Sequence, residues 1–277
     1  MTWVILGGGQ LSNFLVDYSI EHKIKTQLVT RMECDLLNLE SVKNLFNNFT
    51  DDINIVISAS VTRLIGDSAF NFEQNTKIIS NIVSSLNKNV KHIIFFSSVD
   101  VYGLHPWTPI TEATALSPFD YYGLSKQVNE FFIQKTLQNQ DIPWTIFRLS
   151  GLYGNKVSPM GVIGNICNSA SEKRVIVVED TDVIERDYVF VGDVPYFVFN
   201  AIRHSVTGVF NLVTGESFSI KMIANEIIDL LPNCKLEYYK KRNKNRPGIL
   251  RFNNQKLVKS FAGVRLTTLK RGIALQL

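Results

Sequence analysis

The stretch "ILGGGQLSNFLV" (residues 5–16) decides the fold, because it places a glycine turn between an apolar run and an amphipathic run. Gly7 and Gly9 match the first two glycines of a G-x-G-x-x-G turn, and Ser12 occupies the third position. Such glycines permit a tight bend and let backbone N–H groups approach a pyrophosphate at a helix N-terminus. The turn therefore predicts a dinucleotide site, with Ser12 small enough for close helix–strand packing. The alternative is a strand-to-helix bend without a ligand.

Outward from this turn, short apolar runs alternate with amphipathic runs through the first two-thirds of the chain. Strands are expected at 3–6, 26–30, 53–60, 92–98 and 144–150, and helices at 10–22, 35–49, 74–88 and 121–140. Regular alternation of strand and helix is typical of a parallel sheet with helices on both faces. The sequence therefore predicts an α/β fold with a doubly wound, Rossmann-type parallel sheet.

The pattern loosens after about residue 150. We expect a loop at 155–165, strands at 174–178 and 234–240, a strand entering a helix at 186–202 and a helix at 219–231. This indicates a small C-terminal α+β lobe interleaved with the sheet. Residues 1–154 are predicted to form the NAD(P)-binding domain with the catalytic residues. Residues 155–277 are predicted to be mainly a substrate-binding lobe, with 186–204 returning to the Rossmann core.

Composition and charge disfavour several classes of protein. The 277 residues carry a formal net charge of +4 with mostly scattered basic residues, so we expect no nucleic-acid partner. Cys34, Cys167 and Cys234 lie far apart and lack the spacing of a metal site. We therefore expect no metal and a reduced, cytoplasmic protein. The N-terminal residues do not resemble a signal peptide, and no apolar run is long enough to cross a membrane.

The end of the second expected strand bears on the choice of nicotinamide cofactor. An NAD site usually carries an acid there, about 20 residues after the glycine turn. This chain has Thr30 and Arg31 at that place. A cation without an acid suits a 2′-phosphate, so the sequence favours NADP(H) over NAD(H). The alternative is a solvated surface arginine.

Two adjacent tyrosines precede a lysine in "FDYYGLSKQ" (residues 119–127). Tyr122 and Lys126 are four residues apart and face the same side of the expected helix, whereas Tyr121 has Ser125 at that distance. An ammonium beside a phenol lowers the phenol pKa. The spacing therefore selects Tyr122 as a proton donor, against the alternative of a packed helix tyrosine.

Further segments complete an ordered set of motifs. They are "CDLLN" (34–38), "VISAS" (56–60), "FFSSVDVYG" (95–103), "FRLSGLYG" (147–154), "RDYVFVGDV" (186–194) and "NRPGILRF" (245–252). Together with the glycine turn and Tyr-x-x-x-Lys, this set resembles the extended short-chain dehydrogenase/reductase family, the NAD-dependent epimerase/dehydratase group. The resemblance covers nearly the whole chain.

The resemblance implies a set of site residues. Ser98 would bond the substrate carbonyl, Tyr122 would transfer the proton, and Lys126 would hold the nicotinamide ribose and lower the tyrosine pKa. Implied cofactor contacts are Gly7, Gly9, Gln10, Leu11, Ser12, Arg31, Asp35, Leu36, Ala59, Asn75, Tyr122 and Lys126. Implied substrate contacts are Ser98, Asp100, Arg186 and Arg246, with the two arginines at the pyrophosphate of a nucleotide sugar. By the same analogy, the helices at 74–88 and 121–140 would form a homodimer.

The residues after Ser98 narrow the expected chemistry. Family members that eliminate water commonly have an Asp-Glu pair there, and those that epimerise and reduce have a cysteine; this chain has Val99 and Asp100. The chain is also short for the family. The resemblance therefore favours an NADPH-dependent 4-ketoreductase of a nucleotide-linked 4-keto-6-deoxy sugar, making precursors of bacterial-type surface polysaccharide. A nucleotide-sugar C4 epimerase with tightly bound NAD is the alternative. A cofactor-sensing binding protein is disfavoured, because Ser98, Tyr122 and Lys126 are all present.

Overall fold

The computed structural model describes residues 2–63, 65–104, 108–154, 161–179, 184–239, 248–261 and 263–277. The chain divides into two compact units. Unit 1 consists of residues 1–103, 116–148 and 195–210, and unit 2 consists of residues 104–115, 149–194 and 211–277. Residues 195–210 thus belong to unit 1.

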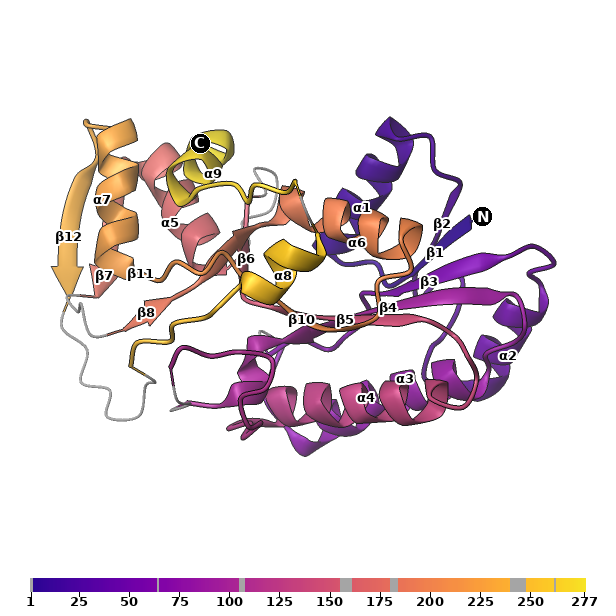
Figure 1. Cartoon of the computed structure of the whole chain (residues 1–277). Helices are drawn as coiled ribbons and strands as arrows, with labels where there is room; N and C mark the ends of the chain where they lie inside the picture. The colour runs from indigo at the N-terminus through magenta and orange to yellow at the C-terminus, as the bar shows by residue number, and fades with distance from the viewer. Residues whose placement is uncertain are drawn as a thin grey trace. The chain divides into compact units, whose positions relative to one another are not determined.

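Unit 1 contains a six-stranded sheet of order β10-β5-β4-β3-β1-β2 (Figure 1). The strands are β1 (Thr2–Leu6), β2 (Thr26–Val29), β3 (Ile53–Ile57), β4 (Val90–Ser98), β5 (Trp144–Leu149) and β10 (Gly208–Leu212). β1 pairs in parallel with both β2 and β3, and β3 with β4. The strand order reverses between β1 and β3, where ligands bind in open α/β sheets. The predicted α/β class with a central parallel sheet is confirmed.

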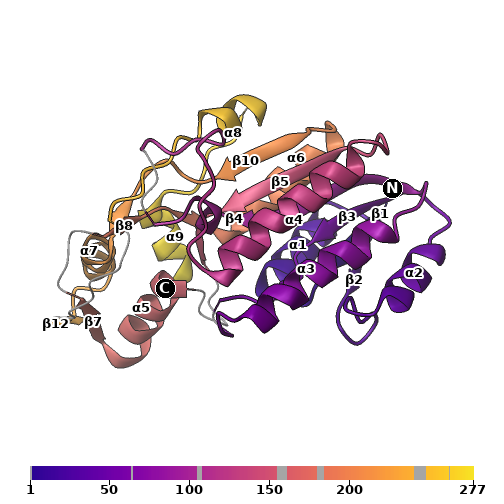
Figure 2. The same ribbon diagram turned by 90° about the horizontal axis from the view of Figure 1, so that it is seen from below.

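Helices cover both faces of this sheet. They are α1 (Gln10–Glu21), α2 (Leu39–Asn47), α3 (Ala69–Ser84), α4 (Tyr121–Leu137) and α6 (Val194–Arg203). Figure 1 shows α3 and α4 on one face and α1 and α6 on the other, and Figure 2 shows α3 and α4 lying side by side. Every residue of β1 and β3 is buried. Coverage on both faces explains why these strands are mostly apolar, with Thr2 and Asn54 as the polar exceptions.

Side-chain caps set the starts of three helices, and the apolar pattern placed two of these starts incorrectly. Asn38 accepts hydrogen bonds from the N–H groups of Glu40 and Ser41, so α2 begins at Leu39 and not at 35. Ser68 caps α3, which spans 69–84 instead of the expected 74–88. Asp120 accepts from the N–H of Gly123 and starts α4 at Tyr121, as expected. A capping oxygen satisfies backbone donors that the helix itself leaves unbonded.

Unit 2 contains short strands and helices. Its strands are β6 (Gly151–Tyr153), β7 (Val175–Glu179), β8 (Glu185–Arg186), β9 (Tyr188–Phe190), β11 (Phe218–Ser219) and β12 (Lys235–Tyr239), and its helices are α5 (Gly161–Lys173), α7 (Ile220–Leu230), α8 (Gln255–Ser260) and α9 (Leu269–Gln276). The strands pair as β11-β8, β12-β7 and β6-β9. A separate apolar cluster packs α5, α7 and α9 together.

Helix α5 corrects the expectation of a loop at 155–165; residues 155–160 lie outside the described residues. Its buried residues Ile163, Ile166, Cys167 and Ala170 follow helical spacing. Gly161 and Gly164 lower the intrinsic helix propensity of this segment, and burial of the apolar stripe outweighs that deficit. β10 was also not predicted as a strand.

Candidate active site

The glycine turn has the geometry of a close backbone approach. Gly7 has a φ of +127°, and a Cβ there would lie 2.7 Å from both the backbone N of Ala59 and Oγ of Ser58. Gly9 is the N-cap of α1 and provides no side-chain cap, and the first turn of the helix contains no acid. A Cβ at Gly9 would meet open space. A bare helix N-terminus beside open space fits a pyrophosphate.

Ser12, in the third glycine position, is fully buried. Its hydroxyl lies 2.7 Å from that of Ser58, which in turn donates to the carbonyl of Leu6 at 3.1 Å. These bonds hold α1 close to the ends of β1 and β3. The side chain of Ser12 thus fixes the packing of the glycine turn against the end of β3.

The end of β2 carries an acid that the sequence interpretation missed. The backbone N–H of Thr30 donates to the carboxylate of Glu33 at 2.8 Å, and the Thr30 hydroxyl donates to the same oxygen. These two bonds lower the pKa of Glu33. A turn, in which the Glu33 and Cys34 N–H groups donate to the Thr30 carbonyl, folds the acid back to the strand end. Arg31 is exposed beside it.

The other implied cofactor residues lie near the ends of β1, β2 and β3. Asp35 accepts from the N–H of Leu37 at 3.1 Å, and Leu36 is buried. Gln10 and Leu11 begin α1, and Ala59 follows β3. Asn75 is buried and exchanges two hydrogen bonds with the backbone of Val61, at 2.7 and 3.0 Å. Its side chain therefore shapes the loop after β3.

Ser98 stands at the carboxyl end of β4, and Asp100 lies in the short 3-10 helix η1 (Val99–Tyr102) that follows. The Ser98 hydroxyl donates to the Asp100 carboxylate and accepts from the Asp100 N–H, each at 3.1 Å. This pair of bonds fixes both side chains at the edge where ligands bind in open α/β sheets.

Tyr122 and Lys126 lie on one side of α4, as their spacing predicts. The Lys126 ammonium is 5.4 Å from the centre of the Tyr122 ring and donates to the carbonyl of Phe96 at 2.9 Å. Burial lowers the pKa of Lys126 to about 8, against the opposing effects of the Glu130 and Asp100 carboxylates. Tyr121 is exposed and lies against the Phe72 ring, away from this group.

The pKa of Tyr122 is raised, whereas the sequence predicted that Lys126 would lower it. Burial is the largest cause, and the carboxylates of Asp100 and Asp120 add to it. The Arg63 guanidinium acts in the opposite direction. The surroundings therefore disfavour the phenolate, because burial penalises its charge and two carboxylates add their repulsion.

A buried ion pair joins α4 to β5, and the sequence interpretation missed it. Arg148 on β5 donates to both carboxylate oxygens of Glu130 on α4, at 2.9 and 2.6 Å. It also donates to the hydroxyl of Tyr102 at 2.7 Å, and Ser97 donates to Glu130 at 2.5 Å. Glu130 follows Lys126 by one helical turn. This i, i+4 spacing was the only sign in the sequence that Glu130 lies near the Tyr122 and Lys126 pair.

The two arginines assigned to substrate are Arg186 and Arg246. Arg186 belongs to unit 2, where its guanidinium donates to the carbonyls of Glu185 and Gly248, each at 2.6 Å. Arg246 lies outside the described residues. Next to Arg186, the buried carboxylate of Asp187 accepts hydrogen bonds from Ser150, Thr214 and Gly215.

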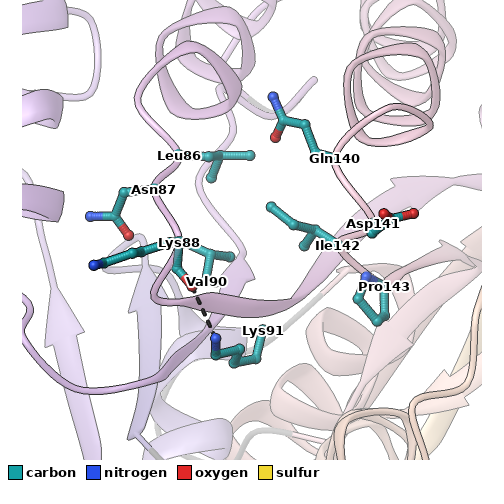
Figure 3. A pocket seen from close by; sticks show the side chains of 9 residues that line it. All are labelled: Leu86, Asn87, Lys88, Val90, Lys91, Gln140, Asp141, Ile142 and Pro143. Carbon is teal, nitrogen blue, oxygen red and sulfur yellow. Dashed lines mark hydrogen bonds between the residues drawn. The ribbon is translucent and has the colours of Figure 1, made fainter.

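A hollow of about 540 Å³ lies elsewhere in unit 1 (Figure 3). Its walls are the segment from Leu86 to Lys91, which leads into β4, and the segment from Gln140 to Pro143, which leads into β5. These are the amino ends of the strands. The hollow is therefore distinct from the site at the carboxyl ends and contains none of the site residues.

Within the described ranges, no group of His, Cys, Asp and Glu side chains could hold a metal ion. In the same part of the chain, every helix is too short or too polar to cross a membrane.

A dinucleotide turn joined to a Ser, Tyr and Lys group defines an oxidoreductase of the short-chain dehydrogenase/reductase type. A profile described as "NAD dependent epimerase/dehydratase family" matches residues 3–213. The chain belongs to this family.

Similar proteins include epimerases and dehydratases. A putative UDP-glucose 4-epimerase of Methanocaldococcus jannaschii is 26% identical, over 83% of this chain and 81% of its own length. The bovine dTDP-D-glucose 4,6-dehydratase is 25% identical over 73% of this chain, but the match spans only 58% of that protein. The solved UDP-glucose 4-epimerase of Thermotoga maritima, with UDP-glucose, has a TM-score of 0.88 at 19% identity, covering 100% of this chain and 97% of that one. That of Thermus thermophilus, with NAD, has a TM-score of 0.81 at 21% identity, covering 99% and 97%.

Proposed function

We propose that this enzyme oxidises and reduces the C4 position of a nucleotide-activated sugar, as an NAD-dependent C4 epimerase. The observation that carries the proposal is the gathering of Ser98, Tyr122 and Lys126 between the end of β4 and the start of α4. Val99 adds support, because no Asp-Glu pair follows Ser98 to eliminate water. The relatives named UDP-glucose 4-epimerase also support it.

The end of β2 supports NAD(H) as the cofactor. The Glu33 carboxylate, held there by Thr30, can accept hydrogen bonds from ribose hydroxyls and would repel a 2′-phosphate. Arg31 remains the argument for NADP(H). The turn at Gly7 and Gly9 and the first N–H groups of α1 would hold the pyrophosphate. We assign further contacts to Gln10, Leu11, Ser12, Asp35, Leu36, Ala59, Asn75, Tyr122 and Lys126.

The side chains of unit 1 would manage protons and orientation, while the bound nicotinamide supplies hydride transfer. Tyr122 would accept the proton of the C4 hydroxyl during oxidation and return it to the C4 oxygen during reduction. Ser98, which donates to Asp100 in the structure, would donate to that same sugar oxygen. The Lys126 ammonium would stabilise the phenolate. Asp100 would accept from a sugar hydroxyl.

An NADPH-dependent 4-ketoreductase of a 4-keto-6-deoxy nucleotide sugar is the second candidate. Arg31, exposed at the end of β2, favours it, because a cation there suits the 2′-phosphate of NADPH. Either activity would provide sugar precursors for surface polysaccharide.

Cofactor content and cofactor consumption separate the two candidates. The purified protein should retain NAD and convert a nucleotide hexose into its C4 epimer without net change in nicotinamide absorbance. Stoichiometric oxidation of NADPH with a nucleotide 4-keto sugar, without C4 epimerisation, would establish the reductase instead. A panel covering the common sugar nucleotides would identify the nucleotide.

We further propose that unit 2 binds the nucleotide sugar, with Arg186 and Arg246 at its pyrophosphate. Arg246→Ala should then raise KM more than it lowers kcat. An unchanged KM for the sugar nucleotide would remove Arg246 from the site.

The exposed face of α4 supports a homodimer. Leu124, Phe131 and Phe132 share one side of this helix and are 38%, 61% and 38% exposed, and Phe70 on the neighbouring α3 is 65% exposed. Apolar stripes of this kind commonly lie in interfaces between subunits. Sedimentation should show a dimer, and Phe131→Glu should yield monomers; a monomeric wild-type chain would refute the assignment.

A further inference from the structure

The loop after β3 brings a cation to the catalytic tyrosine. Nη1 of Arg63 lies 3.2 Å from Asp120 and 3.6 Å from Asp100. Asp120 caps α4, and Asp100 accepts from Ser98. Farther along the same loop, Asp67 accepts from the Tyr122 N–H at 3.1 Å. One guanidinium thus joins the carboxylate that starts the catalytic helix to the carboxylate beside the catalytic serine.

The charges around Tyr122 come from each element packed against it. Asp100 faces it from η1, and Asp120 and Lys126 from the cap and second turn of α4. Arg63 and Asp67 come from the loop after β3. Burial opposes ionisation of the phenol most strongly, and two carboxylates oppose it further. Lys126 is itself destabilised as a cation by burial, so a second cation has a clear electrostatic effect.

We propose that Arg63 is a positioning residue that compensates Asp100 and Asp120 and thereby lets Tyr122 release its proton. The inference rests on the proposed function for its catalytic consequence, but not for its electrostatic content. Arg63 is 56% exposed, so solvent weakens its field without abolishing it. It acts through Tyr122 and is not assigned a contact with substrate.

Arg63 should affect how the reaction depends on pH. Oxidation of a C4 hydroxyl needs the phenolate as base, whereas reduction of a ketone needs the neutral phenol as acid. Loss of the guanidinium beside Asp100 and Asp120 disfavours the phenolate. Both directions share one transition state, so both should slow at pH 7, and the pH at which oxidation reaches half its maximal rate should rise. A residue that merely tied the loop to α4 would lower the rate without moving this pH dependence.

The test compares Arg63→Gln and Arg63→Lys with wild type. A matched control is Arg265→Gln, which removes an exposed arginine of unit 2. For Arg63→Gln we expect a roughly tenfold slower oxidation at pH 7, recovered as pH rises because the pH midpoint of the oxidation rate moves upward. Arg63→Lys should restore most of the oxidation rate, since it keeps the charge. A pH profile of oxidation with an unmoved midpoint, or no rescue by lysine, would overturn the proposal.

A second readout does not require the substrate to be known. The tyrosinate absorbance that is lost in Tyr122→Phe reports ionisation of Tyr122 alone. Asp100→Asn should move this absorbance change to lower pH, and adding Arg63→Gln to Asp100→Asn should move it back to higher pH. Circular dichroism confirms that each variant is folded. Identical titrations with and without Arg63 would overturn the inference, whether or not the protein proves to be an epimerase.

Discussion

Replacing Arg148 by methionine should strongly destabilise unit 1. The Arg148 and Glu130 side chains are 5% and 2% exposed, so methionine would leave the buried Glu130 carboxylate without its arginine partner. Arg148 supplies both carboxylate oxygens of Glu130 with charge-assisted hydrogen bonds and also bonds Tyr102. Removing one member of such a buried pair costs about 3–5 kcal/mol. This is a large fraction of the roughly 5–15 kcal/mol that stabilises a domain.

The double variant Glu130→Leu/Arg148→Met isolates the interaction. It removes both charges, so it should be less destabilised than the sum of the single variants by about 2 kcal/mol or more. An exposed pair gives the matched control. Lys25 and Asp51 are 72% and 75% exposed and 3.7 Å apart, and Lys25→Gln should cost less than about 1 kcal/mol.

Urea unfolding followed by the fluorescence of Trp3 and Trp144, both in unit 1, measures these free energies. We expect a large loss in the free energy of unfolding for Arg148→Met, a partial recovery in the double variant and little change for Lys25→Gln. A loss below about 1 kcal/mol for Arg148→Met, or strict additivity in the double variant, would refute the assignment of a desolvated, mutually dependent pair.

Three further predictions concern the cofactor site and pH. Gly9→Ala should leave stability nearly unchanged, because its Cβ meets open space; it should weaken NAD binding in calorimetry, since the methyl blocks the pyrophosphate, and unchanged affinity would move the site away from α1. Glu33→Gln should shift the kcat/KM ratio toward NADP by about tenfold, and a constant ratio would exclude a role in cofactor choice. Burial lowers the pKa of His92 to about 4, whereas its value in the unfolded chain is about 6.5. As the pH falls from about 6.5 to about 4, the unfolded chain binds a proton that the folded chain does not. The free energy of unfolding should therefore fall by about 3 kcal/mol over this range. His92→Gln should flatten that decline, and an unaltered pH profile would contradict a neutral buried imidazole.

Local patterns were enough to predict the framework of unit 1. The glycine turn follows a buried strand, and the apolar periods of strand and helix repeat in order, so the sheet could be inferred from the residues themselves. Tyr122 and Lys126 are four positions apart on one helix, and helical geometry alone places them on the same side. α5 was missed because its glycines weaken the local preference that its buried stripe overrides.

Contacts between residues distant in the chain could not be predicted in this way. Arg63 meets Asp120 across 57 positions, and Arg148 meets Glu130 across 18. Glu33 is close in sequence to Thr30, but only the turn brings its carboxylate back to the strand end. The sequence by itself determined the parallel sheet, the dinucleotide turn and the tyrosine–lysine pair, because each depends on local periodicity. Only the tertiary structure decided the charge around Tyr122, because that charge is a sum over side chains that folding brings together from separate loops and helices.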